Sequence, residues 1–77
     1  MPRYYFNLTG RDRTVADVEG LELAGDAAAI EEARLFARSL AERRVMSDRD
    51  WRGWAVAIAD EQGRQVDAVP IAKFDSA

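Results

Sequence analysis

Residues 26–46 read DAAAIEEARLFARSLAERRVM and form the longest stretch of the chain with a single periodic pattern. Apolar residues recur there at the i, i+3, i+4, i+7 spacing of one helix face. They are Ala29, Ile30, Ala33, Phe36, Ala37, Leu40 and Ala41. The pattern predicts a helix over about 26–46 with an apolar stripe roughly 140° wide that faces a core. We expect Ile30, Phe36 and Leu40 to supply most of the buried area, because the other four residues are alanines.

Polar residues surround this stripe and mark the start of the helix. Asp26 directly follows Gly25, and its carboxylate suits the N-cap position, where it would accept from free N–H groups of the first turn. Leu35 is the exception on the charged side of the helix. An isolated exposed leucine is ordinary protein surface, and the alternative is that Leu35 contacts a partner.

The chain before the helix has the pattern of a β-hairpin. Tyr4, Phe6 and Leu8 alternate with other residues at period two, which is typical of a strand with one buried face. Residues 10–13 have turn composition, and Thr14 to Val18 then reads as the returning strand. We therefore predict a hairpin over about 3–23.

A second hairpin follows the helix. From Trp54 to Ala59 large and small apolar residues alternate. The turn sequence DEQG follows at 60–63, with Gly63 where a left-handed residue is needed. Pro70 has no N–H, so it belongs at an edge or at the end of pairing. This second hairpin spans about 54–74.

The element order is thus β-β-α-β-β, and we predict a single α+β domain over 1–77. Its simplest architecture is one mostly antiparallel four-stranded sheet with a single helix packed on one face and the first strand placed centrally. The uncovered face would be lined by Tyr5, Asn7, Thr9, Ala55, Ala57 and Ala59. Such a flat surface with little charge can receive another subunit or another protein, and the alternative is an ordinary half-polar face in water.

The amino-acid composition excludes most catalytic mechanisms. The 77 residues contain no cysteine and no histidine, which excludes disulfides, thiolate metal sites and thiol catalysis and removes the commonest general base. No stretch is apolar and long enough for a signal peptide or a membrane span. We expect a cytoplasmic protein without a cofactor or an enzymatic activity. Its small size leaves a thin stability margin, which favours a homodimer.

Three carboxylates lie close together in the sequence around Gly20. They belong to Asp17, Glu19 and Glu22, and carboxylates of this kind can ligate a hard cation or act as an acid/base pair. The spacing of a calcium loop is absent. The simpler interpretation is that these residues solubilise an edge strand and lead into the helix.

The segment from Arg34 to Arg52 is locally basic. It holds six arginines and three acids, a balance of +3, and Trp51 and Trp54 lie at its end. Arginines flanked by aromatic rings can bind nucleic acid through phosphate contacts and base stacking. The overall net charge of −3 opposes this interpretation, because nucleic-acid binding is driven largely by phosphate neutralisation.

Several segments together resemble a family of short bacterial proteins known only as a domain of unknown function. These segments are MPRYYFNL at 1–8, DVEGLEL at 17–23, Glu32-Ala33, Gly53-Trp54, DEQGR at 60–64 and Val69-Pro70. The resemblance implies a small single-domain protein and supplies no activity, cofactor or catalytic residue. Asn7 stands where the resemblance leads us to expect histidine, in relatives that read Tyr/Phe-Phe-His-Leu.

These observations favour a non-enzymatic module for protein-protein interaction or regulation, acting as a homodimer through the uncovered sheet face or with another protein. The candidate surface is Tyr5, Asn7, Thr9, Ala55, Ala57 and Ala59, together with Leu35. Weak nucleic-acid binding through the Arg34 to Arg52 stretch is the alternative.

Overall fold

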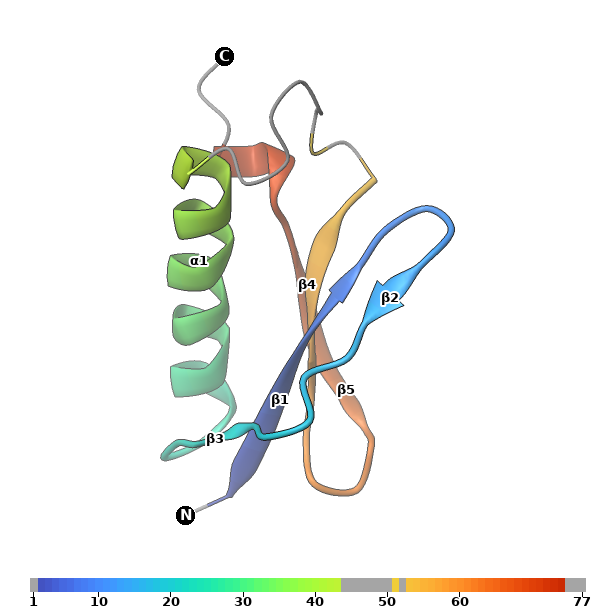
Figure 1. Ribbon diagram of the computed structural model, residues 1–77. Helices are drawn as coiled ribbons and strands as arrows, with labels where there is room; N and C mark the ends of the chain where they lie inside the picture. Colours follow the sequence, from blue (N-terminus) through green and yellow to red (C-terminus); the bar gives the residue numbers. More distant parts are fainter. Residues whose placement is uncertain (1, 44–50, 52, 75–77) are drawn as a thin grey trace.

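The computed structural model describes residues 2–43, 51 and 53–74. Its elements are β1 (Arg3–Thr9), β2 (Thr14–Val15), β3 (Leu21–Glu22), α1 (Asp26–Arg43), β4 (Ala55–Ala59), β5 (Gln65–Pro70) and a short 3-10 helix (Ala72–Phe74). In this part of the chain one helix lies along one face of an open antiparallel sheet (Figure 1). The predicted α+β class is therefore confirmed. We call the face under α1 the inner face and the opposite one the outer face.

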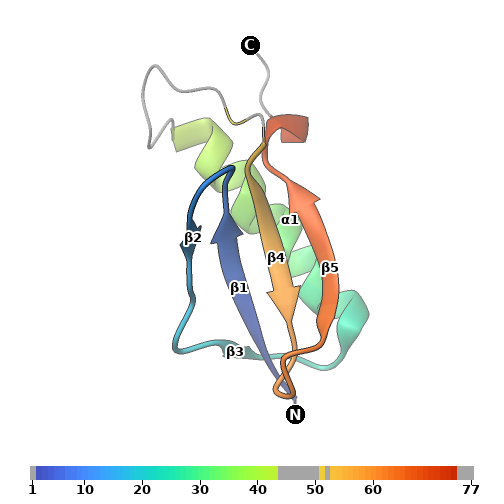
Figure 2. The same cartoon turned by 90° about the vertical axis from the view of Figure 1, so that its right-hand side faces the viewer.

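The sheet has the order β2-β1-β4-β5, and β3 also pairs with β1 (Figure 2). β1 and β4 are the internal strands, and their register runs from Tyr5 opposite Ala59 to Thr9 opposite Ala55. Side chains alternate between the faces of a strand, so Phe6 and Leu8 share the inner face with the residues opposite them in β4. The long central ladder thus joins the two hairpins.

The returning strand of the first hairpin is shorter than the sequence indicates. Thr14 to Val18 was expected to pair as one strand, but only Thr14–Val15 does so, and pairing with β1 resumes at Leu21–Glu22. Between them the chain leaves the ladder, and the side chain of Asp17 bonds to β1 instead, because its carboxylate accepts from the Phe6 N–H at 3.1 Å.

The second hairpin has the predicted turn. The Gly63 N–H donates to the Asp60 carbonyl at 3.0 Å, and Gly63 has a φ of 83°, a conformation that costs glycine little. The Asp60 carboxylate also accepts from the backbone N–H groups of Gln62 and Arg64. These bonds close the turn between β4 and β5.

The helix starts in a different way from the prediction. The first helical bond runs from the Ala29 N–H to the Gly25 carbonyl at 3.0 Å, so Gly25 occupies the cap and Asp26 is already inside the helix. The Asp26 carboxylate accepts from the Tyr4 hydroxyl at 2.8 Å and from Arg64 at 3.3 Å. It therefore ties the helix start to both hairpins. The helix is described as far as Arg43, and the predicted extension over 44–46 lies outside the described residues.

Alanines, and not the larger apolar residues, form the contact between the helix and the sheet. Ala29, Ala33, Ala37 and Ala41 are at most 7% exposed. Small side chains let α1 pack closely on β4 and β5. The expectation that Phe36 is buried in this contact is wrong, because 39% of it is exposed. Phe36 lies at the edge of the apolar stripe, and its ring projects from α1 toward β1 and not onto β4 and β5.

The core lies between α1 and the β4–β5 hairpin. Its largest fully buried side chains are Ile58, Ile71 and Val56. Trp51 is 3% exposed and belongs to the same buried cluster. Ile30 and Leu40 are half-buried and pack against it. The two hairpins thus contribute unequally: among the described residues, the second supplies Val56, Ile58, Val69 and Ile71, whereas the first supplies Tyr4.

Candidate functional site

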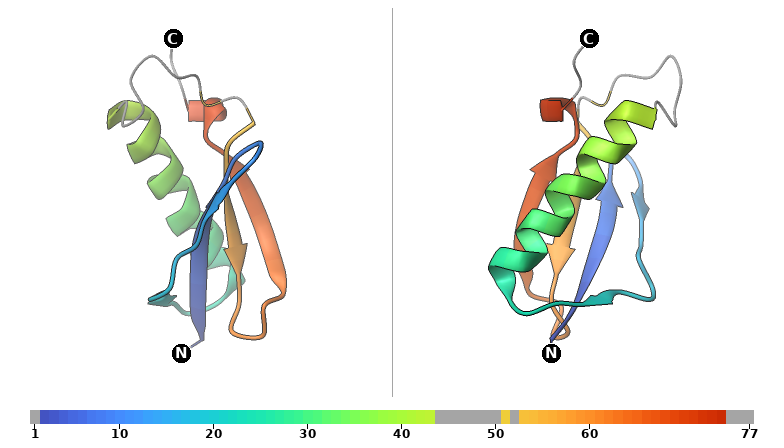
Figure 3. Two further views of the ribbon diagram at one scale, coloured as in Figure 1. Left: turned by 45° about the vertical axis from the view of Figure 1, so that its right-hand side comes forward. Right: turned by 90° about the vertical axis from the view of Figure 1, so that its left-hand side faces the viewer.

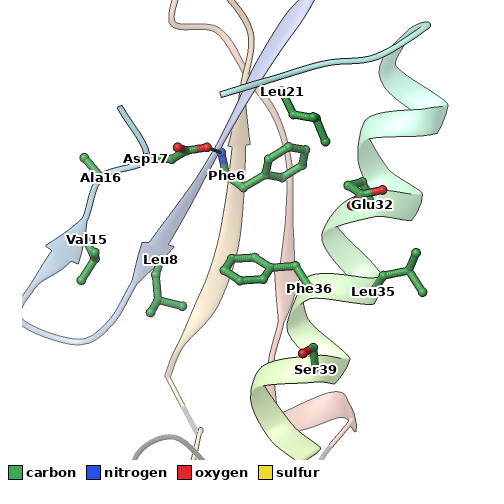
Figure 4. A pocket seen from close by; sticks show the side chains of 10 residues that line it. All are labelled: Phe6, Leu8, Val15, Ala16, Asp17, Leu21, Glu32, Leu35, Phe36 and Ser39. Carbon is green, nitrogen blue, oxygen red and sulfur yellow. Dashed lines mark hydrogen bonds between the residues drawn. The ribbon is translucent and has the colours of Figure 1, made fainter. Parts of the chain in front are cut away.

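A groove opens on the inner face between α1 and the segment that runs from β1 through β2 to β3. Its volume is about 600 Å³, within the ordinary range for binding sites in proteins. The lining residues are Phe6, Leu8, Val15, Ala16, Asp17, Leu21, Glu32, Leu35, Phe36 and Ser39. The rings of Phe6 and Phe36 project into the same space, one from β1 and the other from α1 (Figure 4).

The groove exists because α1 covers only part of the inner face. The helix crosses the sheet obliquely and packs on β4 and β5, while β2 and the β2–β3 connection stand apart from it on the β1 side (Figure 3). Phe6 and Leu8 point to the inner face, pack against the edge of the core and are only half-buried. The walls are more exposed, with Val15 at 53%, Leu21 at 42% and Leu35 at 54%.

Asp17 holds the far wall of the groove to β1. Its carboxylate accepts from the N–H groups of Phe6, Glu19 and Gly20, and its own N–H donates to Asn7 Oδ1 at 2.9 Å. Partial burial opposes ionisation of this carboxyl, but the three N–H donors outweigh that effect and hold its pKa below the ordinary value of 3.8. Asp17 is thus a charged structural group that replaces a missing piece of edge strand.

The structure divides the predicted surface between two sides of the molecule. Six of its residues form cross-strand pairs on the outer face: Tyr5 with Ala59, Asn7 with Ala57, and Thr9 with Ala55. All six are half-buried. Leu35 lies across the sheet from them and lines the groove. These seven residues therefore belong to two separate surfaces.

Around β4, the side chains on the outer face are small and uncharged. The exposed residues Ala68 and Pro70 of β5 lie opposite Ala57 and Ala55 and extend the row of small side chains. The Asp17–Gly20 segment borders the other side, where Asn7 bonds to the Asp17 N–H. The open part of this face is thus centred on β4 and β5.

The three carboxylates near Gly20 have different roles. Asp17 bonds to backbone N–H groups, whereas Glu22 forms an exposed ion pair with Arg3 at 3.2 Å. Arg3 also donates to the Glu19 carbonyl at 2.7 Å. Within residues 2–43, 51 and 53–74, no group of three His, Cys, Asp or Glu side chains is arranged to hold a metal ion.

The basic stretch presents less to a nucleic acid than its sequence indicates. Trp51 is buried and meets Trp54 edge to face, with ring centroids 6.1 Å apart, so its ring packs inside and does not form an exposed stacking surface. Arg38 pairs with Glu42 at 3.2 Å. Arg44, Arg49 and Arg52 lie outside the described residues.

The groove was not predicted from the sequence. Its signal was present in the adjacent pair Leu35-Phe36, which places two large apolar side chains next to each other on a helix where only one of them fits the buried stripe. Helix periodicity alone assigns Phe36 to the buried stripe, but Phe36 is 39% exposed. The four alanines show where the centre of the stripe lies.

Among the described residues, no helix is long and apolar enough to cross a membrane. No curated protein and no solved structure matches the chain. The model of a family described as a domain of unknown function, DUF6894, matches residues 3–72. That match covers nearly the whole chain, and it confirms the resemblance found in the sequence. This protein therefore belongs to the DUF6894 family.

Proposed function

We propose that this chain is a non-enzymatic protein-binding module that holds a partner protein in the groove between α1 and β1. The observation that supports this most is the set of large apolar side chains left exposed there. Val15, Leu21, Leu35 and Phe36 are each between 39% and 54% exposed and surround one concave space. Exposed apolar side chains that gather on one surface mark interaction sites far more often than scattered ones do.

The chemistry of the groove favours binding over catalysis. General acid/base catalysis near neutral pH needs a group whose pKa lies close to 7. Asp17 is the groove carboxylate with backbone donors, and its lowered pKa moves it away from that range. The chain also has no histidine or cysteine to serve as base or nucleophile. The lack of cysteine fits a reducing compartment, so we place this module in the bacterial cytoplasm.

A photo-cross-linking amino acid at position 35 tests the proposal in the cells that make the protein. The matched control carries the same group at position 34, an exposed helix position outside the groove lining. We expect position 35 to give a covalent product with one defined protein and position 34 to give none. The product should decrease when Phe36→Ser is added. Equal labelling from both positions would refute the proposal.

Self-association through the outer face is a second candidate. The uncharged row of Ala55, Ala57, Ala68 and Pro70 supports it, because flat sheet faces with small side chains can stack. We expect light scattering of the purified chain to give the mass of a dimer, and Ala57→Arg to give a monomer, since it places a charge in the middle of the row. A monomer at high micromolar concentration would eliminate this candidate.

A further inference from the structure

A second helix packed against α1 would lie over β1 and β2. Packed helices have axes about 8–10 Å apart, which is about two strand spacings of roughly 4.8 Å, and β1 and β2 lie two positions from β4 and β5 in the sheet. α1 packs on β4 and β5 and crosses the sheet obliquely, so an uncovered area lies beside it, between α1 and the chain from β2 to β3 (Figure 3). The groove is that uncovered area, with Phe6 and Leu8 among its lining residues.

The sheet edge beside β1 offers no place for an added strand, because β2 and β3, which form this edge, have only two residues each. Addition of a strand needs a run of free N–H and C=O groups. On the outer edge of β1, Tyr4 and Leu8 pair with β3 and β2, the Phe6 N–H bonds to Asp17, and the Gly10 N–H bonds to the Arg13 carbonyl. A partner on the β1 side must therefore bind through side chains.

The β5 edge is blocked in its second half. Ile71 donates to the Trp54 carbonyl at 3.1 Å, and because bonded and non-bonded pairs alternate in an antiparallel ladder, Ala68 and Pro70 turn their backbone groups outward. Pro70 has no N–H to offer. The Ala68 N–H is taken by Asp67 Oδ1 at 2.8 Å.

The charge of the groove limits the chemistry of its occupant. Asp17 and Glu32 line it, and none of the described lining residues is basic. Asp17 is occupied by backbone donors, whereas Glu32 is half-buried on the α1 wall and has no ion pair with any described residue. An approaching partner would bury Glu32 further, and a buried carboxylate needs a cationic or hydrogen-bonding group beside it.

We infer that the groove binds an amphipathic α-helix of a partner protein, with its apolar side chains on Phe6, Leu8 and Phe36 and with a lysine or arginine beside Glu32. This inference rests on the proposed protein-binding function. The bound helix lies next to α1 and completes the inner layer over β1 and β2. A second copy of this chain fits less well, because a two-fold contact would bring both copies of Asp17 and Glu32 into one interface without a basic lining residue.

A synthetic peptide serves as the probe. It is about 18 residues long, carries leucines at i, i+3, i+4 and i+7 spacing and lysines elsewhere, and bears a fluorescent label. One comparison peptide has glutamate in place of every lysine, and another has the lysine composition in scrambled order. Fluorescence anisotropy with the full chain should show saturable binding of the lysine peptide. Both comparison peptides should bind at least about tenfold more weakly, because one reverses the charge and the other destroys the apolar stripe.

Two matched pairs of variants distinguish binding of the peptide in the groove from nonspecific attraction of a cationic peptide to an acidic chain. Glu32→Gln should weaken binding about threefold, whereas Glu31→Gln, which removes the same charge from an exposed position outside the lining, should have a smaller effect. Phe36→Ser should weaken binding about tenfold or more. Val18→Ser should leave it unchanged, since Val18 is 85% exposed and lies outside the lining. If Phe36→Ser does not fold, Leu35→Ser at a more exposed position replaces it.

Three results would overturn the inference: tight binding of the glutamate peptide, equal effects of Glu31→Gln and Glu32→Gln, or peptide-induced NMR shifts centred on the outer face at Ala57. The cross-linking experiment distinguishes failure of the helix inference from failure of the proposed protein-binding function. A cross-link from position 35 to a partner segment that is not a basic helix, or to a second copy, leaves the protein-binding module intact and refutes the helix. Without any specific cross-link from position 35, the proposed function itself fails.

Discussion

α1 covers the β4–β5 half of the inner face and leaves the β1 half open, although both halves belong to one sheet. Under α1, Val56 and Ile58 of β4 are fully buried and Val69 of β5 is 7% exposed. On the β1 side, Phe6 and Leu8 point to the same face but are only half-buried. Apolar residues of similar size thus contribute to a core in one half and to an open groove in the other.

The difference originates in the helix and not in the strands. The alanine stripe, defined as Ala29, Ala33, Ala37 and Ala41, brings α1 close to β4 and β5. A narrow, close contact buries its own half of the face well and leaves the other half uncovered. The same four small residues therefore account for both the tight core and the vacancy that we assign to a partner.

The largest difference between the halves is expected in the free energy of unfolding that is lost when a large apolar side chain is truncated. Ile58→Ala should lower the free energy of unfolding by about 2–5 kcal/mol, because it removes a fully buried side chain and leaves a cavity. Phe36→Ala on the groove wall should cost about 1 kcal/mol or less despite its larger side chain. Urea denaturation measures both. Equal losses would mean that the groove half is packed as well as the covered half.

The next test enlarges the alanine stripe. Ala33→Leu should destabilise the protein by about 1–3 kcal/mol, because the added atoms have no space between α1 and β4. Ala27→Leu is the matched control at an exposed position of the same helix and should change stability by no more than about 0.5 kcal/mol. If Ala33→Leu is tolerated, the helix is free to shift toward β1, and the close contact does not set its position.

A third test removes the side chain that supports the groove half. Asp17→Ala should cost about 1–3 kcal/mol at pH 7, because the Phe6, Glu19 and Gly20 N–H groups lose their acceptor. Hydrogen exchange at Phe6 should accelerate more than exchange at Ile58, which lies in the covered half. A uniform change in both would show that the halves unfold together.

The pH dependence of this contribution follows from the lowered pKa of Asp17. A carboxyl with a depressed folded-state pKa stabilises the protein above its unfolded value, which is about 3.8, and the contribution is lost as the pH falls through the folded-state pKa. The free energy of unfolding of the unmodified chain should therefore decrease below pH 3.8 more steeply than that of Asp17→Ala. Parallel acid transitions would contradict the role of the three N–H donors.

The smallest effect is expected where the helix start joins β1. The Tyr4 hydroxyl donates to Asp26, and this bond, with burial and the Asp26 charge, raises the pKa of Tyr4 above 10.0. Its contribution is complete below pH 10.0 and is lost as the pH rises through the raised value. Tyr4→Phe should lower Tm by a few degrees at pH 7 and reduce the alkaline loss of stability. An unchanged alkaline profile would assign that loss to other groups.

The elements of the fold could be predicted largely from local sequence. The helix start near Asp26, the first strand from Arg3 and the turn at 60–63 all follow from periodicity and turn chemistry, which depend on neighbouring residues. The split of the returning strand at Asp17 could not be predicted, because a side chain that replaces a strand depends on a partner eleven residues away, the Phe6 N–H. The expected burial of Phe36 failed for a related reason, since the helix period places a residue on a stripe but not under a particular strand.

What the sequence determined by itself is the class of fold and the chemistry closed to it: one amphipathic helix, two hairpins, and no cysteine or histidine. Only the tertiary structure decided where the helix rests on the sheet, and hence that Leu35 and Phe36 border a groove while Ala55 and Ala57 lie on the opposite face. The reason is that periodicity is a property of neighbours along the chain. The position of the helix depends instead on how closely its small residues let it approach strands distant in sequence.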